Sequence, residues 1–229
     1  MASSLSFYIP RTWMAAFMLL LLTPLHVHAQ DEPMKVRGGV KVGANFASLS
    51  GVQLSGPGAG FYEAEVGART GFAIGGYTIL PLSVPVFLQP EILYVQKGAR
   101  IEITGLSSGT GTVKAGYLEA PILLRFEIPI DESTQGMQVN PYILGGPTIG
   151  VKLHAGAEAS GDVVVTEDFG DVTNTFDFGL TAGAGVGYET ARGTAVAEVR
   201  VSLGVSDVIS SSDESVRTRG IMITVGFIF

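Results

Sequence analysis

Residues 175–189 (TFDFGLTAGAGVGYE) alternate between apolar side chains and small or polar ones at every second position. This period of two is typical of a β-strand, because successive side chains point to opposite faces of a sheet. The pattern recurs at 221–229 (IMITVGFIF), where an apolar row ends in aromatic residues. Because such segments repeat along the chain, the sequence predicts an all-β protein.

Eight segments carry a strand pattern, separated by stretches rich in Gly, Pro, Ser or charged residues. They are 36–46, 71–80, 86–96, 117–128, 139–153, 175–189, 195–205 and 221–229. The stretches 98–115 and 154–173 are predicted to be loops. Connections after the odd-numbered strands are expected to be the longer ones, an asymmetry typical of outer-membrane barrels. Pro90 and Pro121 lack an N–H for sheet pairing, so we expect a bulge near them.

The chain is apolar but contains no helical membrane span. Hydrophobic residues make up 46% of the chain and charged residues 15%, and the mean hydropathy is +0.38. The longest apolar run, 13–22, is shorter than the roughly 20 residues that a transmembrane helix needs. The hydrophobicity is instead distributed over the alternating segments. We therefore predict an eight-stranded antiparallel transmembrane β-barrel with up-and-down meander topology.

Alternation alone also fits a soluble lipocalin-like barrel, in which the apolar row would line the lumen. Two features favour an apolar row that faces lipid. The glycines share the polar row, as at Gly179 and Gly183, and a narrow lumen needs small residues. The apolar row ends in aromatic residues such as Tyr94, Phe126 and Tyr188, which suit the interfacial girdles of a membrane barrel.

Residues 1–29 are predicted to be a secretory signal peptide, followed by a single barrel domain at 30–229. Arg11 precedes an apolar segment, and Val27-His28-Ala29 has the small residues of a cleavage site. A membrane anchor is the alternative, which the short apolar span disfavours. Export then places the protein in the outer membrane. The formal net charge of −7 argues against nucleic acid as a partner, and the chain has no cysteine.

The polar rows place charged residues inside the predicted lumen, where each charge must be paired to offset its desolvation. The predicted lumen network consists of Lys41, Glu91, Glu119, Arg125, Glu198 and Arg200. We expect Glu91 and Glu119 to form its centre, with Arg125 and Arg200 as counter-charges. A structural network is the favoured interpretation. The functional alternatives are a polar relay, an ion path or a ligand pocket.

No motif indicates an enzyme, a cofactor site or a metal site. His154 is the only histidine outside the predicted signal peptide, and the chain lacks both Gly-x-Ser-x-Gly and cysteine. The acidic stretch 154–173 lacks the Asp-x-Asp-x-Asp-Gly spacing of a calcium loop. GAGVG at 183–187 lies within a strand pattern, not before a helix. We therefore expect no catalytic residues, no cofactor and no metal.

Several segments together resemble small outer-membrane β-barrel proteins of Bacteroidetes-type bacteria, of the porin-family or PorT-like group. They are VRGGVKVGANFASLSG at 36–51, FLQPEILYVQKG at 87–98, YLEAPILLRFEI at 117–128, FDFGLTAGAGVGYE, AEVRVSLGVSDVI and GFIF. The resemblance implies an outer-membrane barrel but does not select one activity. A structural, binding or adhesive role through the loops is the leading expectation, and an accessory role in secretion or envelope assembly is the alternative.

We expect three kinds of partner. The first is outer-membrane lipid and lipopolysaccharide around the barrel. The second is the barrel assembly machinery, engaged through the closing strand with Val225, Phe227 and Phe229. The third is an envelope or secretion partner near residues 131–138. A small-solute channel is disfavoured, because side chains are able to fill the interior of an eight-stranded barrel.

Overall fold

The computed structural model of the protein describes residues 35–50, 62–105, 109–130, 139–160, 165–168, 176–205 and 217–229. Residues 35–229 form one compact unit. The predicted signal peptide, 1–29, lies outside the described residues and stays a prediction. No helix among the described residues is long and apolar enough to cross a membrane.

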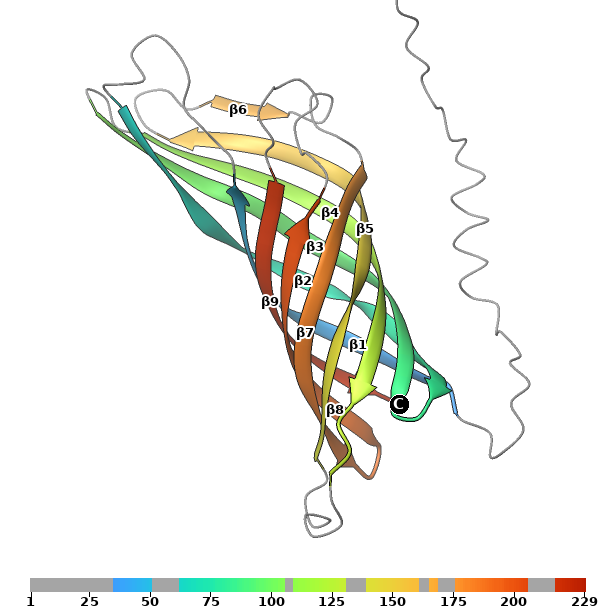
Figure 1. The fold of residues 1–229 in the computed structure, drawn as a ribbon. Helices are drawn as coiled ribbons and strands as arrows, with labels where there is room; N and C mark the ends of the chain where they lie inside the picture. The colour runs from blue at the N-terminus through green and yellow to red at the C-terminus, as the bar shows by residue number, and fades with distance from the viewer. Residues whose placement is uncertain are drawn as a thin grey trace, which may run out of the picture. The chain divides into compact units, whose positions relative to one another are not determined.

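Eight of the nine strands in the described part of the chain form a closed antiparallel ring (Figure 1). The ring consists of β1 (Arg37–Ser50), β2 (Tyr62–Ser83), β3 (Val86–Gly105), β4 (Gly109–Glu127), β5 (Val139–Ser160), β7 (Phe176–Thr190), β8 (Gly193–Gly204) and β9 (Arg217–Ile228). Each ring strand pairs with the next one along the chain, and β9 pairs with β1. The predicted up-and-down barrel is therefore confirmed. The short β6 (Val165–Asp168) adds to β5 alone, outside the ring.

The closing strand β9 lies antiparallel to β1, with Val225 opposite Val42 and Phe227 opposite Val40. The backbone N–H of Phe229 donates to the Gly38 carbonyl at 2.9 Å, which extends this pairing by one bond. Both ends of the described barrel therefore lie at the same rim as the tight turns of β2–β3 and β7–β8. We call this rim the turn side, and the opposite rim the loop side.

Side chains alternate across the barrel wall as the sequence predicts. The outward row is apolar and exposed to the surroundings, for example at Leu180 (56%) and Val225 (59%). The inward row carries buried charges, and Lys41 and Arg125 are only 5% and 2% exposed. A soluble barrel would bury the apolar row, so the lipocalin-like alternative is wrong. This arrangement is that of a barrel whose outer surface contacts lipid.

Inward-facing glycines make room for two tyrosines in the narrow lumen. A Cβ atom at Gly185 would collide with the ring of Tyr142. A Cβ at Gly39 would lie 2.6 Å from Cζ of Tyr77. The glycines of the polar row are thus required by the side chains opposite them, as a crowded barrel interior demands.

The strands β2 to β5 are longer than predicted. β3 and β4 are interrupted only at 106–108, so the predicted loop at 98–115 is mostly strand. Likewise, β5 continues to Ser160 and β2 begins at Tyr62. Figure 1 shows these four strands extending past their neighbours on the loop side. We name this extension the projecting wall and define it as 62–70, 98–105, 109–116 and 154–160.

The expected alternation of long and short connections is wrong. The β3–β4 connection is short, at 106–108, whereas the turn-side β4–β5 connection spans 128–138, so lengths do not alternate strictly.

A bulge was expected near Pro90 and Pro121. The register shifts recorded nearest to them lie at Gly116/Tyr117 in the β4–β5 pairing and at Pro81/Ser83 in the β2–β3 pairing, not at the prolines themselves. The β3–β4 register is the same on both sides, with Pro90 opposite Ile122 and Leu93 opposite Glu119. Backbone pairing between β3 and β4 is interrupted between Pro90 and Leu93. The paired residues on either side of this interruption keep the two strands in the same register.

Candidate functional site

Four buried charges from three strands meet in the turn-side half of the lumen: Lys41 on β1, Glu91 on β3, and Glu198 and Arg200 on β8. Arg200 Nη1 and Nη2 donate to the two carboxylate oxygens of Glu91 at 2.7 and 2.6 Å, a bidentate pair. Arg200 Nε donates to Glu198 Oε1. Lys41 Nζ lies 3.1 Å from Glu91 Oε1 and 3.1 Å from Glu198 Oε1. We call these four residues the turn-side cluster.

The turn-side cluster is closed to water and neutral as a group. Its side chains are between 0% and 4% exposed. Two cations match two carboxylates, and each carboxylate contacts both cations. Such complete pairing is what offsets the desolvation of buried charges. The cluster therefore fills the lumen with a neutral layer of ion pairs.

Gln89 and Tyr142 connect Arg125 to this cluster. Arg125 Nη1 donates to Gln89 Oε1 at 3.2 Å, and Gln89 Nε2 donates to Glu91 Oε1 at 2.6 Å. The Arg125 guanidinium carbon lies 3.6 Å from the centre of the Tyr142 ring, a cation–π contact. The Tyr142 hydroxyl donates to Glu198 Oε2 at 2.9 Å. Arg125 is thus held by an amide and an aromatic face on the inner side of the wall.

A carboxylate nearer the turn side is shared between two arginines. Glu127 Oε1 lies 3.2 Å from Arg125 Nη2 and 2.9 Å from Arg37 Nη2. The Arg37 and Glu127 side chains are 34% and 24% exposed. This pair therefore lies where the lumen opens toward the turn side.

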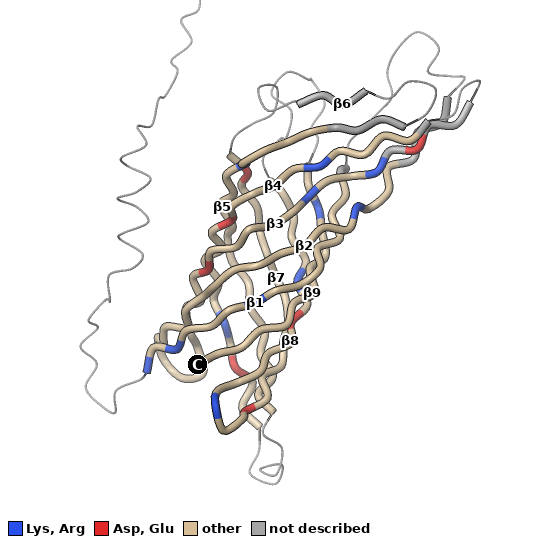
Figure 2. The backbone as a smooth tube through the Cα atoms, turned by 180° about the vertical axis from the view of Figure 1, so that it is seen from behind, with Lys and Arg blue, Asp and Glu red and all other residues tan. Residues whose placement is uncertain are grey.

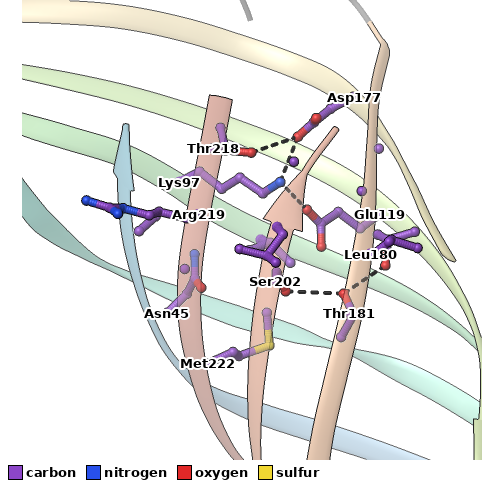
Figure 3. A pocket seen from close by; sticks show the side chains of 18 residues that line it. Asn45, Lys97, Glu119, Asp177, Leu180, Thr181, Ser202, Thr218, Arg219 and Met222 are labelled. Carbon is purple, nitrogen blue, oxygen red and sulfur yellow. Dashed lines mark hydrogen bonds and ion pairs between the residues drawn. The ribbon is translucent and has the colours of Figure 1, made fainter. Parts of the chain in front are cut away.

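A second group of charges lies in the loop-side half of the lumen (Figure 3). Lys97 Nζ is 2.7 Å from Glu119 Oε1 and 2.8 Å from Asp177 Oδ2. The Thr218 hydroxyl contacts the same Asp177 oxygen at 3.5 Å. We call Lys97, Glu119 and Asp177 the loop-side cluster. Their side chains are 14%, 6% and 9% exposed, more than those of the turn-side cluster.

The loop-side cluster borders a small polar cavity. Three hydroxyl groups line it in a chain, with Thr148 Oγ1 3.0 Å from Thr181 Oγ1, which is 3.2 Å from Ser202 Oγ. Met222 of the neighbouring strand β9 also lines this cavity (Figure 3). The cavity volume is about 20 Å³, enough for about one water molecule. The cavity thus offers hydrogen-bonding groups but little volume.

An apolar layer lies between the two clusters. Ala73, Leu93, Val95 and Met222 form one buried group. On the inward row of β3, Leu93 and Val95 lie between Glu91 and Lys97. Water at the cavity therefore meets apolar side chains before it reaches the turn-side cluster.

The structure brings together four of the six residues predicted for the lumen network: Lys41, Glu91, Glu198 and Arg200. Arg125 joins them through hydrogen bonds, not as a direct counter-charge of Glu91. Glu119 does not share a centre with Glu91, because it pairs with Lys97 instead. The expected Glu91–Glu119 centre is therefore wrong.

Sequence reasoning did not assign Lys97 or Tyr142 to the lumen. The odd-numbered residues of β3 point inward, and Lys97 continues this row. A predicted strand that extended past Gln96 would therefore have placed Lys97 in the lumen. The inward position of Tyr142 was obscured by Gly145-Gly146-Pro147 in the middle of β5.

The other residues considered for chemistry do not form a site. His154 lies exposed on the projecting wall, where its ring stacks on Tyr94 with centres 6.4 Å apart. The described residues contain no group of three or more His, Cys, Asp or Glu that could hold a metal. Asp162 and Asp171 of the acidic stretch lie outside the described residues.

Residues 28–210 match the family described as outer membrane protein beta-barrel domain. The chain belongs to this family. This β-barrel protein is therefore located in the outer membrane, and its strands cross that membrane. In such barrels the short turns face the periplasm and the longer connections face outward. The turn side is accordingly periplasmic, and the projecting wall extends from the outer surface.

Solved barrels are similar to the chain at low sequence identity. OprG of Pseudomonas aeruginosa is 15% identical, over 85% of this chain and 94% of that one, with a TM-score of 0.41. Ail of Yersinia pestis is 14% identical, over 86% and 100%, with a TM-score of 0.41. Neisserial surface protein A is 14% identical, over 84% and 97%, with a TM-score of 0.44. These similarities are too distant to transfer a function. No curated protein sequence matches the chain.

Proposed function

We propose that this outer membrane barrel is a closed structural and binding protein whose recognition surface is the projecting wall with its connecting loops. The observation that supports the proposal is the filled lumen at the turn-side cluster. Arg125 and Arg200 are 2% exposed and Gln89 and Leu123 are 0% exposed. Side chains that completely fill the cross-section leave no path for a solute. Binding then takes place outside the lumen.

The projecting wall suits such a role because it stands beyond the apolar band on a rigid scaffold. Its outer face carries polar and charged groups, including Arg100 and Glu102, whose side chains are 57% and 52% exposed. Figure 2 shows the Lys and Arg positions along β2 to β4. Among them, Arg100 is exposed on the wall, whereas Lys97 belongs to the loop-side cluster inside the lumen. Basic groups beside the outer leaflet fit lipopolysaccharide, the proposed lipid partner, because phosphate is an anion.

One shortened variant tests both parts of this proposal. Ala99 lies opposite Val113, so residues 100–112 can be replaced by an Asn-Gly turn without changing the register. We expect the shortened barrel to fold and to lose most binding to purified lipopolysaccharide, and both proteins to show no conductance steps in planar bilayers. Unchanged lipopolysaccharide binding would contradict the role of the wall, and conductance of the native barrel would contradict the closed lumen.

An accessory role in secretion or envelope assembly, as implied by the PorT-like resemblance, is the second candidate. The turn-side rim exposes apolar residues, including Val84 (74%), Ile128 (44%) and Ile130 (41%). Exposed apolar groups in one region are typical of a contact surface. The neighbouring segment 131–138, where a partner was expected, lies outside the described residues.

This second candidate is tested by site-specific photo-crosslinking in living cells. Probes at Val84 and Ile130 should capture one envelope protein, whereas a probe at Arg192, on a different periplasmic turn, should not. Absence of a specific adduct at both apolar positions would argue against the accessory role. The outward row of β9, with Val225, Phe227 and Phe229, is the surface proposed to engage the barrel assembly machinery.

A further inference from the structure

The outward row of β3, β4 and β5 changes from apolar to polar where these strands enter the projecting wall. Below the change lie apolar side chains such as Ile92 and Leu118, which are 36% and 37% exposed. Two rows of three residues lie directly above it: Gln96, Gly116 and His154, then Gly98, Lys114 and Gly156. We call these six residues the boundary rows. They lie where the lipid-facing surface of the barrel ends and the outer polar surface begins.

Aromatic rings form the lower edge of the boundary rows. The centre of the Tyr94 ring is 5.4 Å from that of Phe72 and 6.4 Å from that of His154. Gly116 gives the His154 ring its place, because an added Cβ there would lie 2.8 Å from both imidazole nitrogens. Phe72 is 46% exposed, and His154 is exposed as well. The three rings therefore form an aromatic platform at the membrane boundary.

The charged groups of the boundary rows are basic. Lys114 and His154 are the titratable residues among the six, and none of the six is acidic. Further out on the same row of β3, Arg100 and Glu102 pair with one another at 3.0 Å. The glycines on either side of Lys114 have no side chain that would cover its ammonium group. A molecule at this boundary thus meets aromatic rings and a cation next to one another.

This combination matches a phosphorylated sugar. The C–H groups of a sugar ring pack on the negatively polarised face of an aromatic ring, and an ammonium group binds phosphate. An acyl chain would use the aromatic rings but not the cation. Lipopolysaccharide carries phosphorylated sugars directly above its acyl chains, at the level where the outward row of this barrel becomes polar.

We propose that the aromatic platform and Lys114 bind the phosphorylated sugar headgroup of lipopolysaccharide. A sugar ring packs on Tyr94 and His154, and a phosphate lies at the Lys114 ammonium. The site rests on the lipopolysaccharide binding proposed above and supplies the contacts nearest the membrane, whereas residues 100–112 supply those further out.

His154 itself reports on this site, because it is the only histidine outside the predicted signal peptide. The exported barrel, produced without a histidine tag and with ring-labelled histidine, should give one imidazole signal in NMR spectra. Titration with lipid A, the phosphorylated disaccharide anchor of lipopolysaccharide, should shift this signal to saturation. Phosphatidylglycerol, which has a phosphate but no sugar ring, should shift it little. An equal response to both lipids would overturn the proposal, because it would show unspecific lipid contact.

A glycine variant tests the aromatic platform. Gly116→Ala keeps every group that contacts the ligand but displaces the His154 ring, so the affinity for lipid A should fall by about 2-fold to 10-fold, the effect of one aromatic contact. Gly76→Ala is the matched control. Gly76 lies on the outward row opposite Ile92, and an added Cβ would meet the Gly39 carbonyl at an ordinary 3.5 Å. Lipid A affinity should be unchanged in this control.

Two further variants separate the cation from the rings. Lys114→Gln should lower the affinity for lipid A by about 2-fold to 5-fold, the effect of an exposed ion pair, and should not change it for lipid A without phosphates. Tyr94→Leu should lower the affinity for both forms. Unchanged affinity in all three site variants, with loss of lipopolysaccharide binding in the shortened barrel, would overturn this site but not the role of the wall. Failure of the native barrel to bind lipopolysaccharide would overturn both.

Discussion

The two charged clusters of the lumen contain the same kinds of groups but differ in their access to water. In the turn-side cluster, two cations and two carboxylates contact one another completely and are almost fully buried. In the loop-side cluster, one lysine bridges two carboxylates beside a cavity. Water is able to compensate for a lost partner at the cavity but not in the closed layer. The same substitution should therefore have different effects in the two halves of the barrel.

The largest effect is expected for Glu91→Gln in the turn-side cluster. The substitution keeps the shape of the side chain but leaves Arg200 and Lys41 with only the carboxylate of Glu198. Breaking a buried ion pair from one side costs about 3–5 kcal/mol. Urea titration of the refolded barrel in lipid vesicles measures the free energy of unfolding. A loss below about 1 kcal/mol, the range of exposed ion pairs, would show that this layer is hydrated.

A smaller effect is expected for Glu119→Gln in the loop-side cluster. Lys97 keeps Asp177 as a partner at 2.8 Å, and water from the cavity can solvate its ammonium group. We expect a loss of about 1.5–3 kcal/mol in the same titration, the value of one hydrogen bond to a charged group. If Glu119→Gln destabilised the barrel as much as Glu91→Gln, the distinction between the two clusters would be wrong.

The smallest effect is expected for Glu102→Gln on the projecting wall. Glu102 Oε1 lies 3.0 Å from Arg100 Nε, but both side chains are more than half exposed. Exposed ion pairs contribute little, so the free energy of unfolding should change by less than about 0.5 kcal/mol. This variant is also the matched control for the other two, because it makes the same chemical change at the surface. A large loss here would mean that the wall supports the whole barrel.

The membrane-crossing part of the fold was predictable because a bilayer imposes a strict pattern. At positions such as Leu180 and Val201 the outward side chain must be apolar, and at Thr181 and Arg200 the inward one is polar. The projecting wall has water on its outer face, so no apolar row is required there. Its strands, rich in Thr, Gly and charged residues, consequently had the composition of loops, and Lys97 at its edge was missed.

The sequence predicted which charged side chains are buried in the lumen better than it predicted which of them pair with one another. Alternation shows that Glu119 points inward, but not which charges it meets across the barrel. Those contacts depend on the stagger between strands and on the rotamers that a narrow lumen allows. Glu119 meets Lys97 and Asp177 for this reason, although Arg125 is closer to it in the sequence.

The measurement that tests the closed lumen most directly is the labelling of single cysteines, since the chain contains no native cysteine. His154→Cys places a thiol on the exposed projecting wall, and Thr224→Cys places one opposite Glu198 beside the turn-side cluster. A small charged methanethiosulfonate reagent added outside intact cells should label His154→Cys and leave Thr224→Cys unlabelled until the barrel is unfolded. Labelling of both positions at similar rates in the folded barrel would contradict the account, because water would then pass the turn-side cluster.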